Sequence, residues 1–230
     1  MNPDGNLKLH PIGYIYTDFK EKFGIPRQSG RVPALSGRIV MLPAYARPEA
    51  FRGIEDFSHL WLIFDFSQSH RENWSPTVRP PRLGGNQRIG VFATRSPFRP
   101  NPIGLSCVKL EKVVSGESGI ELLVSGVDLL DGTPVLDIKP YLPYADSYPN
   151  AMGSYAQTFR NYHLEVVFPE EFLSRIPAEK RQALCACLAE DPRPSYQENP
   201  ERIYHMNFAG FEIHFQVKGQ KLEVTGLERD

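Results

Sequence analysis

Short apolar runs separated by turn residues dominate the first 165 positions of the chain. These runs are enriched in β-branched and aromatic residues, which is typical of strands. Helical periodicity between them is limited to a turn near 48–52. Strands without intervening crossover helices cannot build a parallel doubly wound sheet, so the pattern favours a mainly β antiparallel barrel or sandwich. The predicted strands are 10–16, 37–42, 59–66, 88–94, 104–114, 120–127 and 135–139.

Two of these strands differ in the exposure that their patterns predict. The run 60–66 is apolar at nearly every position, which indicates a strand covered on both faces. Lys109, Glu111 and Lys112 instead place charged side chains on the run 104–114. That strand is therefore expected to have one face in water.

The pattern changes near residue 165. Helix formers follow in 168–173 and 177–189, with proline near the first turn and apolar positions at Leu184, Cys187 and Leu188. The prolines of 191–194 end this helix. Three further strands are predicted at 202–208, 211–217 and 221–225. We expect a β-domain over 1–165 and a small α+β domain over 166–230.

Composition restricts the class of protein. The 230 residues are 41% hydrophobic and 23% charged, as in a soluble globular protein, and the net charge of −1 argues against a general nucleic-acid coat. Cys107, Cys185 and Cys187 cannot form a disulfide framework and are expected to be small buried groups in a reducing compartment. The six histidines have no metal-ligand spacing, and no apolar stretch reaches the roughly 18 residues of a membrane span. These features predict a cytoplasmic protein with neither a membrane segment nor a metal.

The most unusual segment lies between Trp74 and Leu110. It carries six basic residues and no acidic one, among closely spaced prolines and glycines that exclude a helix. Arginines on such a backbone are suited to bind phosphate or carboxylate. The structural alternative is that they bind carbonyl groups of the loop itself.

A second candidate is the turn at Asp131. Asp131, Thr133, Asp137 and Lys139 alternate at period two, so they can share one face and offer carboxylates to hydroxyl or ammonium groups. The alternative is a hairpin tip at Asp131-Gly132, with Lys139 neutralising Asp137.

Two other places combine polar residues with loop or strand boundaries. The loop 16–30 carries Lys20, Lys22, Arg27 and Gln28, either as a binding loop or as a solvated connection. His59 precedes the apolar strand and is either a base or a structural residue. The sequence contains no Ser/His/Asp spacing, phosphate-binding P-loop or dinucleotide fingerprint.

Taken together, long motifs in both parts of the chain resemble the TrmO family, also called TsaA-like or YaeB proteins. The resemblance spans essentially the whole sequence. Its motifs are Glu21-Lys-Phe with Pro26-Arg-Gln, Phe57-Ser-His-Leu-Trp61, Thr77-Val-Arg-Pro-Pro-Arg-Leu-Gly-Gly-Asn86, Gly90-Val-Phe-Ala-Thr-Arg-Ser96, Phe98-Arg-Pro-Asn-Pro-Ile-Gly104, Asp131-Gly-Thr-Pro-Val135, Asp137-Ile-Lys-Pro-Tyr-Leu-Pro143 and Asp191-Pro-Arg-Pro194.

The resemblance implies a single-sheeted antiparallel β-barrel with a small α+β C-terminal domain, usually as a homodimer. It further implies that the protein binds S-adenosylmethionine and methylates N6 of threonylcarbamoyladenosine at position 37 of tRNA. Ser67 stands where relatives commonly have histidine, so a backbone contact is expected there. The cofactor residues carried over by motif are Pro26, Arg27, Gln28, Ser67, Gln68, Arg95, Leu105, Leu129, Leu130, Asp131, Gly132 and Thr133.

Within this implied site we assign roles as hypotheses. Arg27 or Arg95 pairs the cofactor carboxylate, Asp131 binds its ammonium or diol, and Leu105 packs on adenine. Asp137 and His59 are the candidates to take the N6 proton, with desolvation alone as the alternative. Basic residues are expected to bind the substrate carboxylate and the tRNA phosphates, and one tyrosine is expected to add to the tRNA surface. They are Lys20, Lys22, Arg79, Arg82, Arg88, Arg99 and Arg193, with Tyr196.

Two other functions remain open on the sequence. One is a non-catalytic module that binds S-adenosylmethionine or RNA, because no base is evident. The other is a methyltransferase for another nucleoside or a small metabolite, because the barrel motifs identify the cofactor better than the acceptor.

Overall fold

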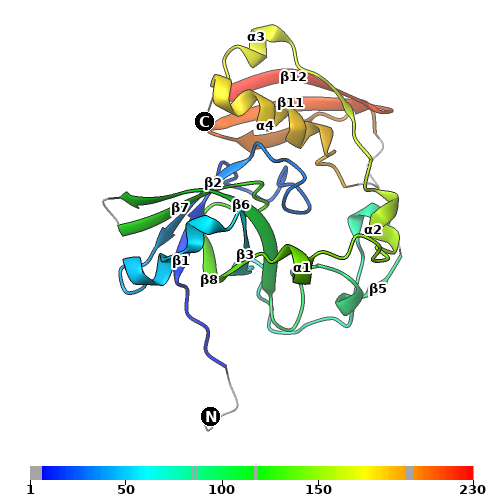
Figure 1. The fold of residues 1–230 in the computed structure, drawn as a ribbon. Coiled ribbons are helices and arrows are strands. Elements are labelled where there is room, and N and C mark those ends of the chain that lie inside the picture. Colours follow the sequence, from blue (N-terminus) through cyan, green and yellow to red (C-terminus); the bar gives the residue numbers. More distant parts are fainter. Residues whose placement is uncertain (1–6, 84, 86, 117–118, 195–198, 230) are drawn as a thin grey trace.

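Six antiparallel strands close into a barrel in the computed structural model, which describes residues 7–83, 85, 87–116, 119–194 and 199–229 (Figure 1). The strand order around the barrel is β1-β2-β7-β6-β3-β8. The prediction of a mainly β antiparallel barrel is therefore confirmed. The strands are β1 Gly13–Tyr16, β2 Ser36–Met41, β3 His59–Asp65, β6 Ile103–Gly116, β7 Gly119–Ser125 and β8 Thr133–Pro140.

Side chains of the barrel strands alternate between the interior and the outer wall. In β3, Leu60, Leu62 and Phe64 are buried, whereas Trp61 and Ile63 are only partly buried. The prediction that this strand is covered on both faces is therefore wrong, because its outward side chains are apolar but belong to a partly exposed wall.

The wet face predicted for β6 is confirmed. Lys109, Glu111 and Lys112 are exposed, and an irregularity in the pairing with β7 between Leu110 and Lys112 lets two consecutive side chains face water.

Residues 66–102, between β3 and β6, form a long excursion from the barrel that contains most of the Arg- and Pro-rich segment. It contains a two-stranded sheet, β4 Thr77–Val78 with β5 Ile89–Gly90, and the 3-10 turns η3 Pro81–Leu83 and η4 Val91–Ala93. The predicted strand 88–94 is thus wrong beyond Gly90. The chain turns there because the amide and hydroxyl of Thr94 both donate to the Val91 carbonyl, at 3.1 and 2.8 Å. The helical turn expected near 48–52 is the 3-10 helix η1 Pro48–Phe51, followed by η2 Ile54–Asp56.

The C-terminal part is a four-stranded sheet with a helix on one face (Figure 1). The sheet order is β10-β11-β12-β9, with β9 parallel to β12, and α1 Pro143–Asp146 and α2 Tyr155–Thr158 lie on the connection from the barrel. The predicted helices and strands are confirmed, and β12 is longer than expected. The elements are β9 Glu165–Val167, α3 Glu170–Leu173, α4 Ala178–Ala189, β10 Tyr204–Phe208, β11 Phe211–Lys218 and β12 Lys221–Arg229.

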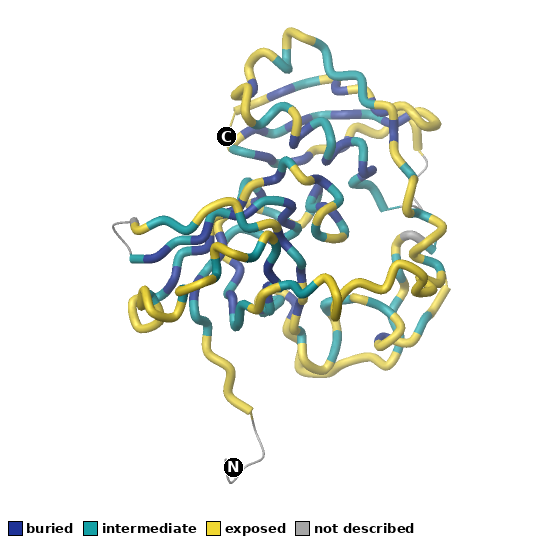
Figure 2. The backbone as a smooth tube through the Cα atoms, in the orientation of Figure 1, coloured by how far each residue is buried: buried dark blue, intermediate teal, exposed yellow. Residues whose placement is uncertain are grey.

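One continuous apolar core joins the barrel to the C-terminal sheet (Figure 2). Phe19, on the loop after β1, packs edge-on against Phe208 with ring centroids 5.4 Å apart. Further along the same loop, Phe23 stacks on Phe215 at 6.4 Å. The loop 17–31 is therefore clamped between the two parts of the molecule. Within the described ranges, none of the helices has the length and apolar character needed to cross a membrane.

Candidate functional site

The loop 26–30 meets the arginine-rich segment at Gln28. The Arg95 guanidinium donates a hydrogen bond to Oε1 of Gln28, and the Gln28 amide turns back to the carbonyl of Arg27. Two predicted cofactor residues from distant segments are thus in direct contact. Arg95 is exposed, so its guanidinium is accessible at this junction.

Beneath this junction lies a partly buried carboxyl group, Asp128. Ser106 Oγ donates to Asp128 Oδ1 at 2.6 Å, the Ser29 amide also bonds the carboxylate, and Ser29 Oγ accepts the Cys107 amide at 3.1 Å. Burial raises the pKa of Asp128 to about 6, although these hydrogen bonds and the charge of Arg95 act in the opposite direction. A carboxyl that ionises near pH 6 beside an arginine marks a site suited to a charged ligand.

Asp128 was not among the predicted site residues. The available signal was its position: it opens the turn that carries the predicted Leu129–Thr133 and directly follows the buried Val127.

The turn after Asp128 is held by the loop that follows β1. The Thr17 amide donates to Asp131 Oδ1 at 2.9 Å, and its hydroxyl donates to the Leu129 carbonyl at 3.0 Å. Lys20 Nζ pairs with Asp131 Oδ2 at 2.5 Å, while Gly132 adopts a positive φ of 73° that glycine readily allows. Lys20, which was predicted to bind tRNA, therefore forms an ion pair with Asp131, which was predicted to bind the cofactor.

The other members of the turn are also constrained. Thr133 is buried, and its hydroxyl donates to the Leu130 carbonyl at 2.7 Å. This bond closes the turn and leaves no role for the Thr133 hydroxyl as a free donor in this arrangement.

Leu105 lies on the outer wall of the barrel, where 51% of its surface is exposed. It pairs across β6 and β3 with Ile63, which pairs in turn with Asp137 on β8. Because neighbouring strands are about 4.8 Å apart, Asp137 lies about 10 Å from Leu105 along this row. Asp137 forms an ion pair with Lys139 at 2.9 Å, as expected for neutralisation, and its Oδ1 also accepts the Ile138 amide.

His59 lies at the far end of the same wall. It begins β3 opposite Lys109, four residues before Ile63 and so about 13 Å from it along the strand. Its Nδ1 is 2.9 Å from Ser58 Oγ, and its ring meets the edge of Tyr141. The structure therefore does not bring the two candidate bases together.

Ser67 and Gln68 form an exposed turn immediately after β3. Lys22 Nζ donates to the Gln68 carbonyl at 3.0 Å and to Ser69 Oγ at 3.4 Å. Lys22, like Lys20, thus contacts the predicted cofactor segments instead of standing apart from them.

Pro26 and Arg27 line a cavity of about 190 Å³ between the loop and the C-terminal domain. Arg27 donates to the Arg193 carbonyl at 3.0 Å. The Arg193 side chain, only 11% exposed, is bound by Asp191 at 2.8 Å. The predicted residues Arg27 and Arg193 therefore meet at the domain boundary.

The remaining predicted cations lie on the excursion of 66–102. Arg79 is exposed, Arg88 bonds Thr77 Oγ1 at 3.2 Å, and Arg99 bonds the Thr94 carbonyl at 3.3 Å. The side chain of Arg82 and the whole of Tyr196 fall outside the described residues.

Exposed aromatic rings accompany these cations. They were not assigned to the tRNA surface from the sequence, although they are interspersed with the arginines along residues 66–102. Phe92 is 72% exposed, lies 6.1 Å from the ring of Trp74, and has the Arg99 guanidinium 6.0 Å from its centroid. Arg71 lies 3.8 Å from the centre of the Phe98 ring. Cations interleaved with exposed rings are typical of surfaces that bind single-stranded nucleic acid.

Comparison with known proteins agrees with these features. The model of the tRNA-methyltransferase O N-terminal domain matches residues 14–147, and that of the TrmO C-terminal domain matches 161–230. A tRNA (adenine(37)-N6)-methyltransferase of Escherichia coli (strain K12) is 44% identical over 231 residues, 97% of this chain and 98% of the relative. A putative S-adenosylmethionine-dependent methyltransferase of Pseudomonas aeruginosa is 43% identical over 221 residues, 90% of this chain and 91% of the relative. The crystal structure of TrmO from P. aeruginosa superimposes with a TM-score of 0.79 at 37% identity, covering 98% of each chain. The chain therefore belongs to the tRNA-methyltransferase O family, as its motifs indicated.

Proposed function

We propose that this chain is an S-adenosylmethionine-dependent methyltransferase that methylates N6 of adenosine 37 in tRNA, and that the nucleoside carries a threonylcarbamoyl group. The names of the Escherichia coli and P. aeruginosa relatives support the reaction and the cofactor. The main structural observation for the site is the contact of Gln28 with Arg95 next to the Asp128 carboxyl. This contact joins two predicted segments to the residue that opens the predicted turn Leu129–Thr133.

The residues at this junction fit the cofactor. S-Adenosylmethionine supplies an electrophilic methyl group on a sulfonium, and also presents a carboxylate, an ammonium and an adenine ring. Arg95 supplies a cation for the carboxylate, and the ionised Asp128 supplies negative charge for the ammonium or sulfonium. Leu105, exposed on the wall, offers an apolar surface for adenine. Asp131 can bind the cofactor ammonium only if its ion pair with Lys20 breaks.

For the acceptor we assign proton removal to Asp137 in preference to His59. The N6 lone pair is delocalised into the purine and the carbamoyl group, so loss of the proton assists attack. Asp137 shares a row with Leu105, whereas His59 lies about 13 Å along the strand from that row. Positioning of the two reactants supplies the rest of the rate enhancement.

The tRNA surface that we propose is the excursion of 66–102. Its exposed cations attract the anticodon-loop phosphates locally, although the whole chain has a net charge of −1. Trp74 and Phe92 provide rings on which unpaired bases can stack. Arg193 is assigned a structural role because Asp191 already binds it. We assign the substrate carboxylate to Lys20 and Lys22, which contact the predicted cofactor residues Asp131 and Gln68.

The assembly and location are proposed from the family resemblance. We propose a homodimer, which light scattering on the purified chain tests by its mass, and a cytoplasmic location, where tRNA is available.

The decisive assay follows transfer of labelled methyl from S-adenosylmethionine to tRNA with and without the threonylcarbamoyl group. Label on the modified tRNA alone supports the proposal. Cofactor binding without transfer identifies a binding module, and label on the unmodified tRNA identifies a different acceptor.

Two variants test the assigned residues. Arg95→Glu is expected to weaken cofactor binding at least tenfold by calorimetry, because it replaces the carboxylate partner with a like charge. Arg52→Glu, the same change at an exposed position between η1 and η2, serves as the matched control. Asp137→Asn is expected to lower turnover with cofactor affinity unchanged; full turnover would exclude it as the proton acceptor.

A further inference from the structure

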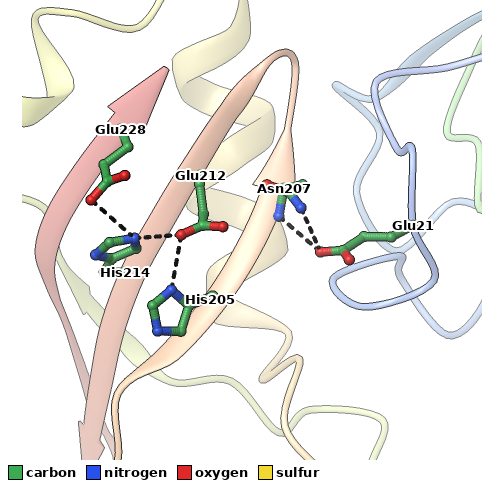
Figure 3. Close-up of polar contacts among 6 residues, drawn as sticks. All are labelled: Glu21, His205, Asn207, Glu212, His214 and Glu228. Atoms are coloured by element: carbon green, nitrogen blue, oxygen red, sulfur yellow. Dashed lines mark hydrogen bonds and ion pairs between the residues drawn. The ribbon is translucent and has the colours of Figure 1, made fainter. Parts of the chain in front are cut away.

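The C-terminal sheet carries a cluster of two histidines and a glutamate on the face opposite α4 (Figure 3). His205 Nδ1 lies 3.0 Å from Glu212 Oε1, and His214 Nε2 lies 2.7 Å from the same oxygen. The three donor atoms all lie within 4.8 Å of one another. The two imidazole rings are 4.3 Å apart between centroids, so they converge on one carboxylate.

The strand register builds this arrangement. His205 on β10 is paired directly with His214 on β11, and Glu212 is two residues from His214, so that all three share one face. The alternate residues of the same strands, such as Met206 and Ile213, are buried in the core. The backbone therefore fixes which side chains meet.

The neighbouring strand leaves space for the His214 ring. The pairing of β11 with β12 is irregular between His214 and Phe215, as in a β-bulge that redirects a side chain. Gly226 is the partner of His214, and a Cβ atom at that position would lie 3.0 Å from Nδ1 of the ring. The absence of a Cβ atom at Gly226 thus leaves room for the His214 ring in the orientation that points its Nε2 toward Glu212.

We propose that His205, Glu212 and His214 bind one divalent transition-metal ion of the zinc type. Imidazole nitrogen with one carboxylate oxygen is a donor set that Zn²⁺ accepts, whereas Ca²⁺ and Mg²⁺ prefer oxygen alone. Ligand atoms of a tetrahedral ion with bonds of about 2.1 Å lie about 3.4 Å apart, so the pairs at 2.7 and 3.0 Å must open by less than about 1 Å.

The fourth position of such an ion faces solvent. Glu228 on β12 is 72% exposed, and its Oε1 lies 4.0 Å from His214 Nε2, so it can supply either a fourth ligand or a bond to a bound water. His205 binds the ion through Nδ1 with its proton on Nε2, and His214 binds through Nε2 with its proton on Nδ1. Each imidazole is then neutral, and the nitrogen that faces Glu212 offers its lone pair to the ion.

This site lies apart from the proposed methyl-transfer site but is linked to its loop. Asn207, two residues after His205 on β10, donates to Glu21 Oε1 through its amide groups at 3.1 and 3.2 Å (Figure 3). An ion that joins β10 to β11 therefore stabilises the strand on which the loop 17–31 rests. Sequence spacing predicted no metal because the ligands become neighbours only through the pairing of two strands.

The test uses the full chain without a histidine tag, treated with EDTA and dialysed, and titrates it with Zn²⁺ by calorimetry and with Co²⁺ by visible absorption. We expect one ion per chain, a Co²⁺ spectrum of four-coordinate type, and a rise in melting temperature on adding Zn²⁺. His214→Gln and Glu212→Gln should each weaken binding at least tenfold. Absence of binding to the wild-type chain overturns the proposal.

The matched control is His163→Gln, which removes another histidine that has a carboxylate partner, Glu190 at 3.2 Å. This variant should bind as the wild type does. An equal loss in His163→Gln and His214→Gln overturns the proposal, because binding would not depend on the cluster. Melting curves in EDTA establish that each variant is folded before titration, and Glu212→Gln decides the question where a histidine variant does not fold.

Discussion

Replacement of Asp128 by asparagine should stabilise the protein at neutral pH. Asparagine has nearly the shape of the protonated carboxyl, and its side-chain oxygen can still accept the bond from Ser106, which reaches Oδ1. It removes the charge that burial disfavours. The perturbation therefore isolates the cost of holding an ionised group at the junction with Arg95.

The magnitude follows from the pKa. Burial raises the pKa of Asp128 from an ordinary value of about 3.9 to about 6. At about 1.36 kcal/mol per pKa unit, the ionised form costs about 3 kcal/mol in the folded state. The pKa is raised, so the stability that the neutral group contributes is fully present below about pH 3.9 and is lost as the pH rises through about 6.

The assay is urea unfolding of the wild type and of Asp128→Asn between pH 5 and pH 7. Linkage gives a loss of about 1.5 kcal/mol in the wild type by pH 5 and about 2.8 kcal/mol by pH 7. The advantage of the variant should therefore grow by about 1.3 kcal/mol across this range. Any effect of asparagine that does not depend on pH cancels in this difference.

A constant difference between the two proteins from pH 5 to pH 7 would refute the reasoning, since Asp128 would then not titrate in that window. Glu111→Gln is a control of opposite sign. The pKa of Glu111 is lowered by bonds from Ser125 and Lys109, so its ionised form is favoured and its replacement removes stability that is present at neutral pH.

Three substitutions test the packing that supports the site. Gly104→Ala places a methyl group 2.2 Å from the Phe64 ring, so it should cost about 1–3 kcal/mol in urea unfolding and weaken cofactor binding through the adjacent wall; unchanged stability would exclude this contact. Arg31→Met breaks a bidentate ion pair with Glu190, whose side chain is only 7% exposed. The free energy of unfolding should fall by about 3 kcal/mol, and a melting temperature equal to that of the wild type would contradict this. Phe19→Ala empties a fully buried position and should cost about 3–5 kcal/mol, with a loss below about 1 kcal/mol inconsistent with the joint core.

Most strands, and helix α4, could be predicted because their signal is local. Alternation of apolar residues fixes a strand over five or six positions, and the helix carries its stripe within Ala178–Ala189. The strand predicted over 88–94 failed because Val91, Phe92 and Ala93 have strand-like composition but the chain turns at Thr94. Apolar composition alone does not distinguish an exposed aromatic ring from a buried one, and Phe92 is exposed.

The site was only partly predictable because its energetics depend on contacts between distant segments. The motifs supplied Gln28 and Arg95, but only the fold shows that they touch. Asp128 gains its raised pKa from burial against groups that are remote in sequence. Arg193 looked free among prolines, although Asp191 two residues earlier was available to bind it. Charge can be read from a sequence, but its availability depends on packing.

The loop 17–31 connects the C-terminal domain to the proposed cofactor site. Fixing one residue of a loop costs about 1–2 kcal/mol of conformational entropy, so a segment without strands or helices needs external contacts to keep one shape. Phe19 and Arg31 provide them by binding the C-terminal domain, at Phe208 and Glu190. Between them, Gln28 reaches Arg95. We therefore expect the C-terminal domain to raise cofactor affinity by ordering this loop in advance, although none of the proposed cofactor residues belongs to it.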